Sequence, residues 1–361
     1  MTNSDFQGSA LTTALTEPVS VSWQSPSNIA LVKYWGKKGR QLPVNPSLSM
    51  TLSKAVTETK LTAFPRNADG DISLDFWFEG SQDNTFGERM CTFLQSVTDI
   101  FPWLAQVNLK LETHNTFPHS AGIASSASAF SALALCLCSL EAELCGVMLS
   151  ESEFRFKASY VARLGSGSAC RSLFPGFTMW GLSKSLPGSS DFLAVPVTEV
   201  HPVFETLRDT ILIVNQNKKP VSSTEGHSRM TGHPFAEARI KQAGKNTSDL
   251  LEALKTGDKH NFCRIVENEA FTLHALMMTS DSAFMLMLPE TIYIISRIQE
   301  ARKEKGLHIC FTLDAGPNIH LLYFEDQFEQ VNKLIVEELL KNNEQNMRID
   351  DLYGNGPVKT A

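Results

Sequence analysis

The segment Phe117-Pro-His-Ser-Ala-Gly-Ile-Ala-Ser-Ser-Ala-Ser-Ala-Phe130 restricts the fold most, because a strand ends before it and a helix begins inside it. Its small side chains let a ligand approach the backbone. A helix start offers unpaired N–H groups and a dipole that favours phosphate. The hydroxyls of Ser125, Ser126 and Ser128 could add donors or hold Mg2+. The pattern differs from the Walker phosphate loop, and a Ser/Ala-rich helix packed tightly on a neighbour is the alternative.

Around this segment the hydrophobic pattern predicts a mixture of strands and helices. Alternation or short apolar runs predict strands at 72–78, 107–111, 210–214, 308–313 and 319–323. Helical spacing predicts helices at 86–100, 125–145, 152–164, 224–256, 259–279, 290–304 and 327–342. The order lacks the regular alternation of a doubly wound sheet, so the pattern favours an α+β fold. The Pro/Gly/Ser-rich stretch Ser183–Ser190 is expected to be a loop near a domain boundary.

Length and charge exclude several classes of protein. A chain of 361 residues corresponds to about two domains, and 42% hydrophobic residues exclude wholesale disorder. The net charge of −7 disfavours a general nucleic-acid-binding protein but allows a local basic pocket. The longest apolar run near the middle, Ala132–Cys138, is too short for a membrane span, so no membrane association is expected.

The cysteines and the N-terminus predict a cytoplasmic protein. The spacing of Cys136, Cys138 and Cys145 matches no common zinc site, and we expect buried free thiols in a reducing compartment. Residues 1–18 are rich in Ser and Thr and lack the basic and apolar regions of a secretory signal. We therefore expect a flexible N-terminal tail.

A second segment, Ser27-Asn-Ile-Ala-Leu-Val-Lys-Tyr-Trp-Gly-Lys-Lys38, concentrates positive charge. Lys33, Lys37 and Lys38 lie beside Tyr34 and Trp35, and lysine is a point-charge partner for phosphate. A solvated basic turn is the alternative.

Two further segments carry single charged side chains in turn-forming surroundings. In Leu164-Gly-Ser-Gly-Ser-Ala-Cys-Arg-Ser172, backbone N–H groups could bind an anion and Arg171 could bind a carboxylate through two hydrogen bonds. In Thr312-Leu-Asp-Ala-Gly-Pro-Asn318, Asp314 follows an apolar strand, a rigid position for an active-site carboxylate. A surface arginine at a flexible helix start, and an aspartate that caps its own turn, are the alternatives.

Together, the four segments resemble the GHMP kinase superfamily and, within it, the mevalonate diphosphate decarboxylase family. Residues 120–130 resemble the phosphate loop of the superfamily, which homoserine, mevalonate and galactose kinases share. Residues 28–37, 165–172 and 314–318 resemble the decarboxylases more specifically, in the family's order. The resemblance covers most of 19–325 and implies a two-domain α+β GHMP-kinase-like fold, with an active-site cleft between an ATP-binding domain (19–195) and a second domain (196–361).

The resemblance implies a reaction and a set of site residues. ATP phosphorylates the 3-hydroxyl of mevalonate 5-diphosphate; phosphate and CO2 then leave, and isopentenyl diphosphate forms. The implied catalytic residues are Asp314, Arg171 and Asn28; the implied substrate-binding residues are Tyr34, Lys37, Ser166, Gly167, Ser168, Ser222 and Ser223; the implied ATP-binding residues are Ser120, Ala121, Gly122, Ser125, Ser126, Ser128 and Lys33, with Ser126 as the Mg2+ ligand. Asp314 could deprotonate the hydroxyl, orient it or stabilise positive charge at C3. A homodimer is common in the family.

One loop departs from the family pattern, and several functions compete with the leading one. Members usually have Gly-Met after the Ser-Ser pair, whereas this chain has Gly226-His227. His227 and His233 could form a metal pair, and Arg229 could contact a diphosphate, although a solvated face explains them as well. The alternatives are a phosphomevalonate decarboxylase, a mevalonate or phosphomevalonate 3-kinase and a catalytically silent small-molecule sensor.

Overall fold

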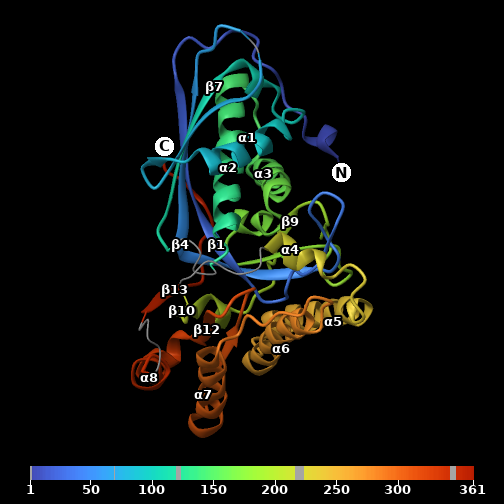
Figure 1. Ribbon diagram of the computed structural model, residues 1–361, viewed down its shortest axis with the longest axis vertical. Helices are drawn as coiled ribbons and strands as arrows, with labels where there is room; N and C mark the ends of the chain where they lie inside the picture. The colour runs from blue at the N-terminus through green and yellow to red at the C-terminus, as the bar shows by residue number, and fades with distance from the viewer. Residues whose placement is uncertain (1, 69, 119–122, 216–222, 342–346) are drawn as a thin grey trace.

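The computed structural model describes residues 2–68, 70–118, 123–215, 223–341 and 347–361. Figure 1 shows two halves along the long axis of the molecule, each built on a sheet with helices against it. Strands and helices are mixed in both halves, which confirms the expected α+β class.

The first sheet has the order β14-β1-β4-β7-β5-β6, with β8 and β9 extending from β4. Its strands are β1 (Val19–Ala30), β4 (Ser47–Phe64), β5 (Ser73–Phe78), β6 (Ser81–Gln82), β7 (Asn108–Asn115), β8 (Phe177–Trp180), β9 (Ala194–Pro196) and β14 (Val358–Lys359). The helices α1 (Asn84–Gln95), α2 (Ser125–Cys145) and α3 (Glu151–Gly165) lie on one face of it (Figure 1). Short 3-10 turns are η1 (Asn3–Phe6), η2 (Pro102–Gln106) and η3 (Gly167–Leu173), and β2 (Lys37–Lys38) pairs with β3 (Leu42–Pro43).

Helix α2 has the predicted bounds and forms the centre of the first half. Its middle residues are almost all buried, because the helix packs between the sheet and α3. Among the described residues it is the one helix long and apolar enough to cross a membrane, and 67% of that window is buried inside the protein. An apolar helix in a soluble core has the same composition, so this feature is weak evidence of a membrane span.

The second sheet has the order β11-β12-β10-β13 and is antiparallel throughout. Its strands are β10 (Leu207–Ile213), β11 (Ile309–Thr312), β12 (Ile319–Phe324) and β13 (Met347–Leu352). The helices of this half are α4 (Ser223–Ser228), α5 (Ala236–Thr256), α6 (Lys259–Met278), α7 (Pro289–Lys305) and α8 (Phe328–Leu334), with 3-10 turns η4 (Pro202–Thr206) and η5 (Glu325–Gln327) and a π turn η6 (Ile335–Leu339).

Aromatic packing joins the two halves. Phe177 on β8 lies edge-on to Phe204 of η4, at 6.2 Å between ring centroids. Phe204 in turn packs on Phe262 of α6 and Phe324 of β12. These rings belong to one buried cluster that draws residues from both sheets. A continuous apolar core therefore connects the two halves.

A bend in β4 is held by a carboxylate of the other half. The β1–β4 register shifts between Pro26 and Asn28, so the backbone of β4 around 53–55 leaves the ladder. The Asp351 carboxylate of β13 accepts hydrogen bonds from three consecutive N–H groups there, at 2.7, 2.9 and 2.7 Å. Buried N–H groups require such partners. Asn28, at the end of this register shift, lines the cleft between the halves.

Three predicted elements were wrong in detail. The expected helix 224–256 is interrupted, since Gly232 takes a left-handed φ of +74° and Pro234 follows before α5 begins. The helix predicted at 86–100 ends at Gln95. The helix predicted at 327–342 is α8 followed by the π turn.

Both ends of the chain lie against the first half. In the segment expected to be a flexible tail, Phe6 packs on Tyr160 and the Gly8 N–H donates to the Ile100 carbonyl at 2.8 Å. The segment is held against the first half because burial of the apolar Phe6 ring is favourable. The last residues return as β14 beside β1, so the chain ends in the first sheet. The Ser183–Ser190 loop joins β8 to β9 within that sheet.

Candidate active site

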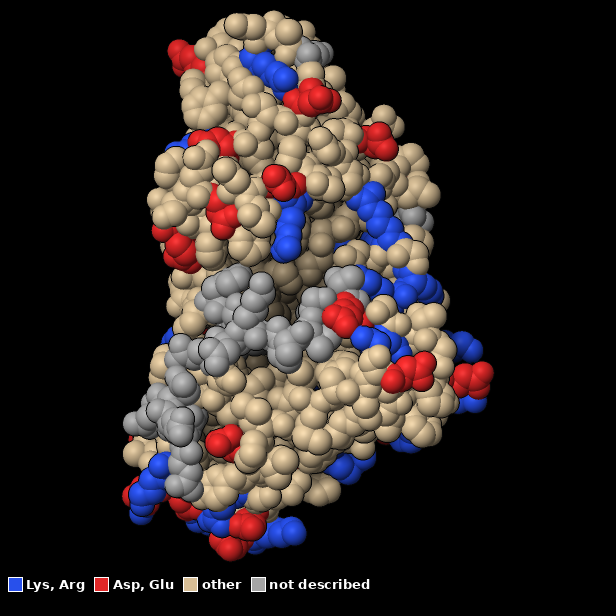
Figure 2. Space-filling view, viewed as in Figure 1, with Lys and Arg blue, Asp and Glu red and all other residues tan. Residues whose placement is uncertain are grey.

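A cleft of about 850 Å³ lies between the halves, and Figure 2 shows the surface hollowed at that level. The charged residues that line it are Lys33, Lys37, Arg40, Arg89, Arg171 and Asp314. Five cations therefore face one carboxylate among the described lining residues, although the whole chain carries a net charge of −7. A concave site with this charge suits a polyanionic ligand.

Lys33 and Asp314 form an ion pair across the cleft. Lys33 follows β1, Asp314 follows β11, and the Lys33 Nζ lies 2.9 Å from Asp314 Oδ1. The Lys33 side chain is 2% exposed, and burial lowers its pKa although Asp314 opposes that shift. Asp314 is 27% exposed, so the carboxylate still reaches the cleft. Lys33, for which the family resemblance implies ATP binding, is thus paired with the candidate catalytic carboxylate.

A second buried ion pair fixes the backbone of Lys33. Glu269 of α6 and Arg239 of α5 form a salt bridge at 2.7 Å, with both side chains fully buried. Glu269 accepts from the Lys33 N–H at 2.8 Å, and Arg239 donates to the Lys33 carbonyl at 3.0 Å. His274 of α6 lies 3.1 Å from the Asp314 carbonyl through Nε2. Helices of the second half thus position both members of the Lys33–Asp314 pair.

Arg171 and Asn28 form a buried polar cluster, as the resemblance implies. Arg171 Nε donates to Asn28 Oδ1 at 3.2 Å, and Asn28 Nδ2 donates to Ser172 Oγ at 2.8 Å. Arg171 also donates through Nη1 to Ser47 Oγ of β4, and Ser47 donates to the Val32 carbonyl. Burial lowers the pKa of Arg171. No carboxylate pairs with this guanidinium among the described residues, so its charge is available to a ligand.

The start of α2 lies beside the start of η3. Ala124 takes a left-handed φ of +34° immediately before α2. Ser126 Oγ lies 3.3 Å from Ser166 Oγ, which lies 3.5 Å from Ser168 Oγ. Ser126, Ser166, Gly167 and Ser168 all line the cleft. The oxygens of the three serine hydroxyls can coordinate Mg2+, and their O–H groups can donate hydrogen bonds to phosphate.

Two of the predicted ATP-binding serines do not line the cleft. Ser128 is buried, with its hydroxyl 2.6 Å from Thr57 Oγ1 and donating to the Ser125 carbonyl. Its position one turn into the helix directs its hydroxyl to the sheet and away from the cleft. Ser125 begins α2 but is not among the lining residues.

Tyr34 and Lys37 occupy the wall next to Arg171. Burial raises the pKa of Tyr34, and its hydroxyl has no hydrogen-bond partner among the described residues. Lys37 Nζ is 3.4 Å from the Gln41 amide oxygen, and partial burial lowers its pKa. The Lys37 ammonium has no carboxylate partner among the described residues and is available to an anion, whereas the Tyr34 hydroxyl is buried in the wall.

Some predicted residues cannot be compared with the structure. Ser120, Ala121, Gly122 and Ser222 lie outside the described residues. Ser223 begins α4, and its side chain is outside the described part of the chain.

The two histidines weighed as a metal pair have separate surroundings. His227 lies against Tyr34 and Trp35, whereas His233 Nε2 lies 3.0 Å from the Leu276 carbonyl. The described residues contain no group of three or more His, Cys, Asp or Glu side chains that could hold a metal ion. Arg229 pairs with Glu225 at 2.8 Å.

Sequence reasoning missed the residues that hold the site together. These are Ser47, Ser172, Arg239, Glu269 and His274, each far along the chain from its partner. It also missed the extension of the cleft along α1, lined by Phe86, Arg89, Met90, Thr92 and Phe93. The amphipathic pattern predicted the helix α1. It did not indicate which cavity the residues of this helix would line.

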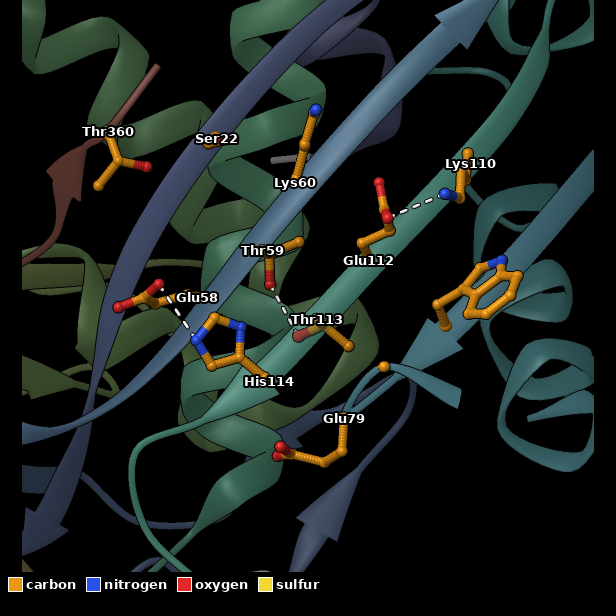
Figure 3. A pocket seen from close by; sticks show the side chains of 12 residues that line it. Ser22, Glu58, Thr59, Lys60, Glu79, Lys110, Glu112, Thr113, His114 and Thr360 are labelled. Carbon is orange, nitrogen blue, oxygen red and sulfur yellow. Dashed lines mark hydrogen bonds and ion pairs between the residues drawn. The ribbon is translucent and has the colours of Figure 1, made fainter. Parts of the chain in front are cut away.

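A second hollow, of about 670 Å³, lies on the face of the first sheet opposite the helices (Figure 3). Its lining has three glutamates (Glu58, Glu79 and Glu112) and two lysines (Lys60 and Lys110). Lys110 pairs with Glu112 at 2.9 Å, and His114 lies 3.2 Å from Glu58. It therefore lacks the excess of cations found in the cleft between the halves.

Comparison with known proteins agrees with this geometry. Residues 25–193 match the diphosphomevalonate decarboxylase-like N-terminal domain, and residues 210–356 match the mevalonate 5-diphosphate decarboxylase C-terminal domain. The chain is 33% identical over 336 residues to a diphosphomevalonate decarboxylase of Ganoderma lucidum, covering 87% of this chain and 80% of that protein. It is 31% identical to the enzyme of Candida albicans, covering 88% and 87%.

Solved structures give the same result. Mevalonate diphosphate decarboxylase from Staphylococcus aureus is similar with a TM-score of 0.81, at 29% identity over 95% of this chain and 98% of that one. The protein MDDEF in complex with MVAPP, AMPPCP and magnesium is similar with a TM-score of 0.79, at 29% identity over 95% and 99%.

Proposed function

This chain belongs to the diphosphomevalonate decarboxylase family, and from that premise we propose how its cleft performs the reaction. The enzyme decarboxylates mevalonate 5-diphosphate at the expense of ATP and forms isopentenyl diphosphate, ADP, phosphate and CO2. The observation that carries the assignment of roles is the Lys33–Asp314 pair, which faces a cleft lined otherwise by cations.

Asp314 accepts the hydrogen bond of the substrate's 3-hydroxyl and takes its proton as the oxygen attacks the γ-phosphorus of ATP. The Pγ–O bond to ADP breaks as the new P–O bond forms. The neighbouring Lys33 ammonium, 2.9 Å away, stabilises Asp314 as a carboxylate. Phosphoryl transfer depends chiefly on positioning and on neutralising charge, and the cations of the cleft supply both.

Arg171 and Asn28 hold the substrate carboxylate in the second stage. The C3–O bond breaks and phosphate leaves with its electron pair, so positive character develops at C3. The bond between C2 and the carboxylate then breaks, and its electron pair forms the new double bond as CO2 leaves. Arg171 is buried and held by Asn28 and Ser47, which supports a role in fixing the geometry of that carboxylate.

The phosphate chains are assigned to the two remaining groups of donors. The residues that bind the 5-diphosphate are Tyr34, Lys37, Ser166, Gly167 and Ser168; their place in the lining of the cleft supports this assignment. Ser126, at the start of α2, contacts the phosphates of ATP. Mg2+ accompanies ATP in this family and neutralises part of the triphosphate charge; the hydroxyl oxygens of Ser126 and Ser166, 3.3 Å apart, suit it chemically. Ser222 and Ser223 keep their expected place in the substrate loop as a prediction.

We also propose the domain boundaries, the cellular location and the oligomeric state of the protein. We assign residues 19–195 and 196–361 to the two domains. The change of sheet between β9 and β10 supports this division, although the last strand, β14, returns to the first sheet. A cytoplasmic location is supported by the seven cysteines, all of which are free. A homodimer, implied by the family resemblance, is tested by sedimentation velocity.

Product analysis tests the function against its nearest alternatives. The purified protein is incubated with Mg-ATP and, in parallel, with mevalonate, its 5-phosphate and its 5-diphosphate, while ADP and CO2 are both followed. CO2 from the 5-diphosphate alone is the expected result. CO2 chiefly from the 5-phosphate would identify a phosphomevalonate decarboxylase, which the departure at Gly226-His227 makes the second candidate. ADP without CO2 would identify a 3-kinase.

A further inference from the structure

His227 reaches the cleft because the residue before it has no side chain. A Cβ atom on Gly226 would lie 2.3 Å from the Trp35 ring, so a larger residue there would push α4 away. With glycine, the His227 ring packs at 4.2 Å from the centroid of Tyr34 and at 5.1 Å from that of Trp35. His227 lines the same cleft as Lys33, Arg171 and Asp314.

A backbone contact sets the tautomer of this imidazole. The Gly36 N–H donates to His227 Nδ1 at 3.0 Å, so Nδ1 is an acceptor and carries no proton. The proton of the neutral ring is therefore on Nε2. Burial, together with the charges of Lys37 and Arg171, lowers the pKa of His227 to about 3, which keeps the ring uncharged at neutral pH.

The Nε2–H group faces the open cleft. Among the described residues, none accepts a hydrogen bond from His227 Nε2, and this nitrogen is not fully buried. It is thus accessible from the cleft and free to donate to a ligand. The Gly36 N–H that donates to Nδ1 belongs to the residue before Lys37, and both Lys37 and His227 line the cleft.

We propose that His227 is a specificity-determining residue, whose Nε2–H donates a hydrogen bond to a phosphoryl oxygen of the substrate's diphosphate beside Lys37. The proposal rests on the proposed function and concerns the 5-end of the same substrate. A neutral donor next to an ammonium adds a directed hydrogen bond without further charge repulsion among the cations of the cleft. A diphosphate extends further from the mevalonate carbon chain than a monophosphate, so this bond favours the 5-diphosphate over the 5-phosphate.

Two variants separate the nitrogen from the bulk of the ring. His227→Met keeps a long side chain but removes both nitrogens, whereas His227→Gln keeps an amide N–H donor. Dissociation constants for mevalonate 5-diphosphate and mevalonate 5-phosphate are measured by calorimetry, without ATP. We expect His227→Met to weaken binding of the diphosphate about tenfold, the typical effect of one lost hydrogen bond. The monophosphate should bind as in the unchanged protein, and His227→Gln should recover part of the loss.

Equal weakening of both ligands, or none of either, would overturn the proposal. Proton-detected nitrogen NMR of the unchanged protein gives a second readout that needs no variant. The His227 signals should report the Nε2–H tautomer and shift when mevalonate 5-diphosphate, but not the 5-phosphate, is added. Other tautomers or no shift would also overturn it. Failure of the proposed function has a different signature, since the unchanged protein would then release no CO2 from the 5-diphosphate.

Discussion

Lys33 Nζ lies 2.9 Å from Asp314 Oδ1, although 281 positions separate the two residues in the chain. Each comes from a different half of the protein, so the pair exists only when the two halves are packed together. The mevalonate 3-hydroxyl meets the exposed side of the same carboxylate in our account. The site is thus a product of how the halves meet.

Replacement of that carboxylate tests its role directly. Asp314→Asn keeps the shape and the hydrogen-bonding capacity but removes the base and the negative charge. We expect kcat to fall by about 10²–10⁴-fold, the usual contribution of a positioned acid or base. Calorimetry should find mevalonate 5-diphosphate still bound, since its phosphates and carboxylate meet other residues. Near-normal turnover would contradict the assignment.

The ion pair also predicts a pH dependence. Burial lowers the pKa of Lys33, so this ammonium loses its proton at a lower pH than the usual value of 10.5. As pH rises through that pKa, Asp314 loses its positive partner, and kcat should decline on the alkaline side below pH 10.5. Lys33→Arg keeps its charge throughout this range and should move the decline to higher pH. An alkaline limb at the same pH in both proteins would exclude Lys33 as its cause.

The buried pair Arg239–Glu269 should contribute to stability as well as to position. Glu269→Gln retains an oxygen that can accept from the Lys33 N–H but leaves the buried Arg239 without its counter-charge. Urea denaturation should give a free energy of unfolding lower by roughly 3–5 kcal/mol. The control is Asp249→Asn, which breaks the exposed pair with Lys245 on α5 and should change stability little. Equal effects of the two substitutions would refute this interpretation.

Two serines on β4 distinguish the effect of a hydrogen bond to Arg171 from the effect of removing a buried hydroxyl. Ser47 accepts from Arg171, whereas Ser49, equally buried and two residues along the strand, has no hydrogen-bond partner among the described residues. Ser47→Ala should raise the KM for mevalonate 5-diphosphate about 10–150-fold, because a lost hydrogen bond to a charged group costs roughly 1.5–3 kcal/mol. Ser49→Ala should leave it unchanged, and neither should alter the KM for ATP. The idea fails if both variants behave alike in steady-state assays.

Local sequence signals predicted the elements that pack locally. The apolar run of α2 defined its bounds, and the strong alternation at 72–78 predicted β5. The long strands β1 and β4 went unrecognised because their polar residues, such as Ser25 and Thr57, are buried between the sheet and α2. The residues after 346 were missed as well, since β13 is polar and gains its place by pairing with β10.

The site was predicted where motifs carry it and missed where distant residues support it. Asp314, Arg171, Asn28 and Lys37 came from short motifs and line one cleft. The role of Glu269 could not be predicted from a local motif, because its partner Lys33 lies 236 positions away in the chain. The motif also did not indicate that Ser128 faces the sheet, because it carries no information on which side of the helix borders the cleft.

The ratio of CO2 to ADP in a single turnover decides whether one cleft performs both phosphorylation and decarboxylation. Enzyme in excess over mevalonate 5-diphosphate is mixed with Mg-ATP, and both products are quantified over time. If Asp314 directs phosphorylation and Arg171 holds the carboxylate that is then lost, ADP and CO2 should reach equal amounts. ADP formation with no CO2 would contradict the central claim that one cleft performs both steps.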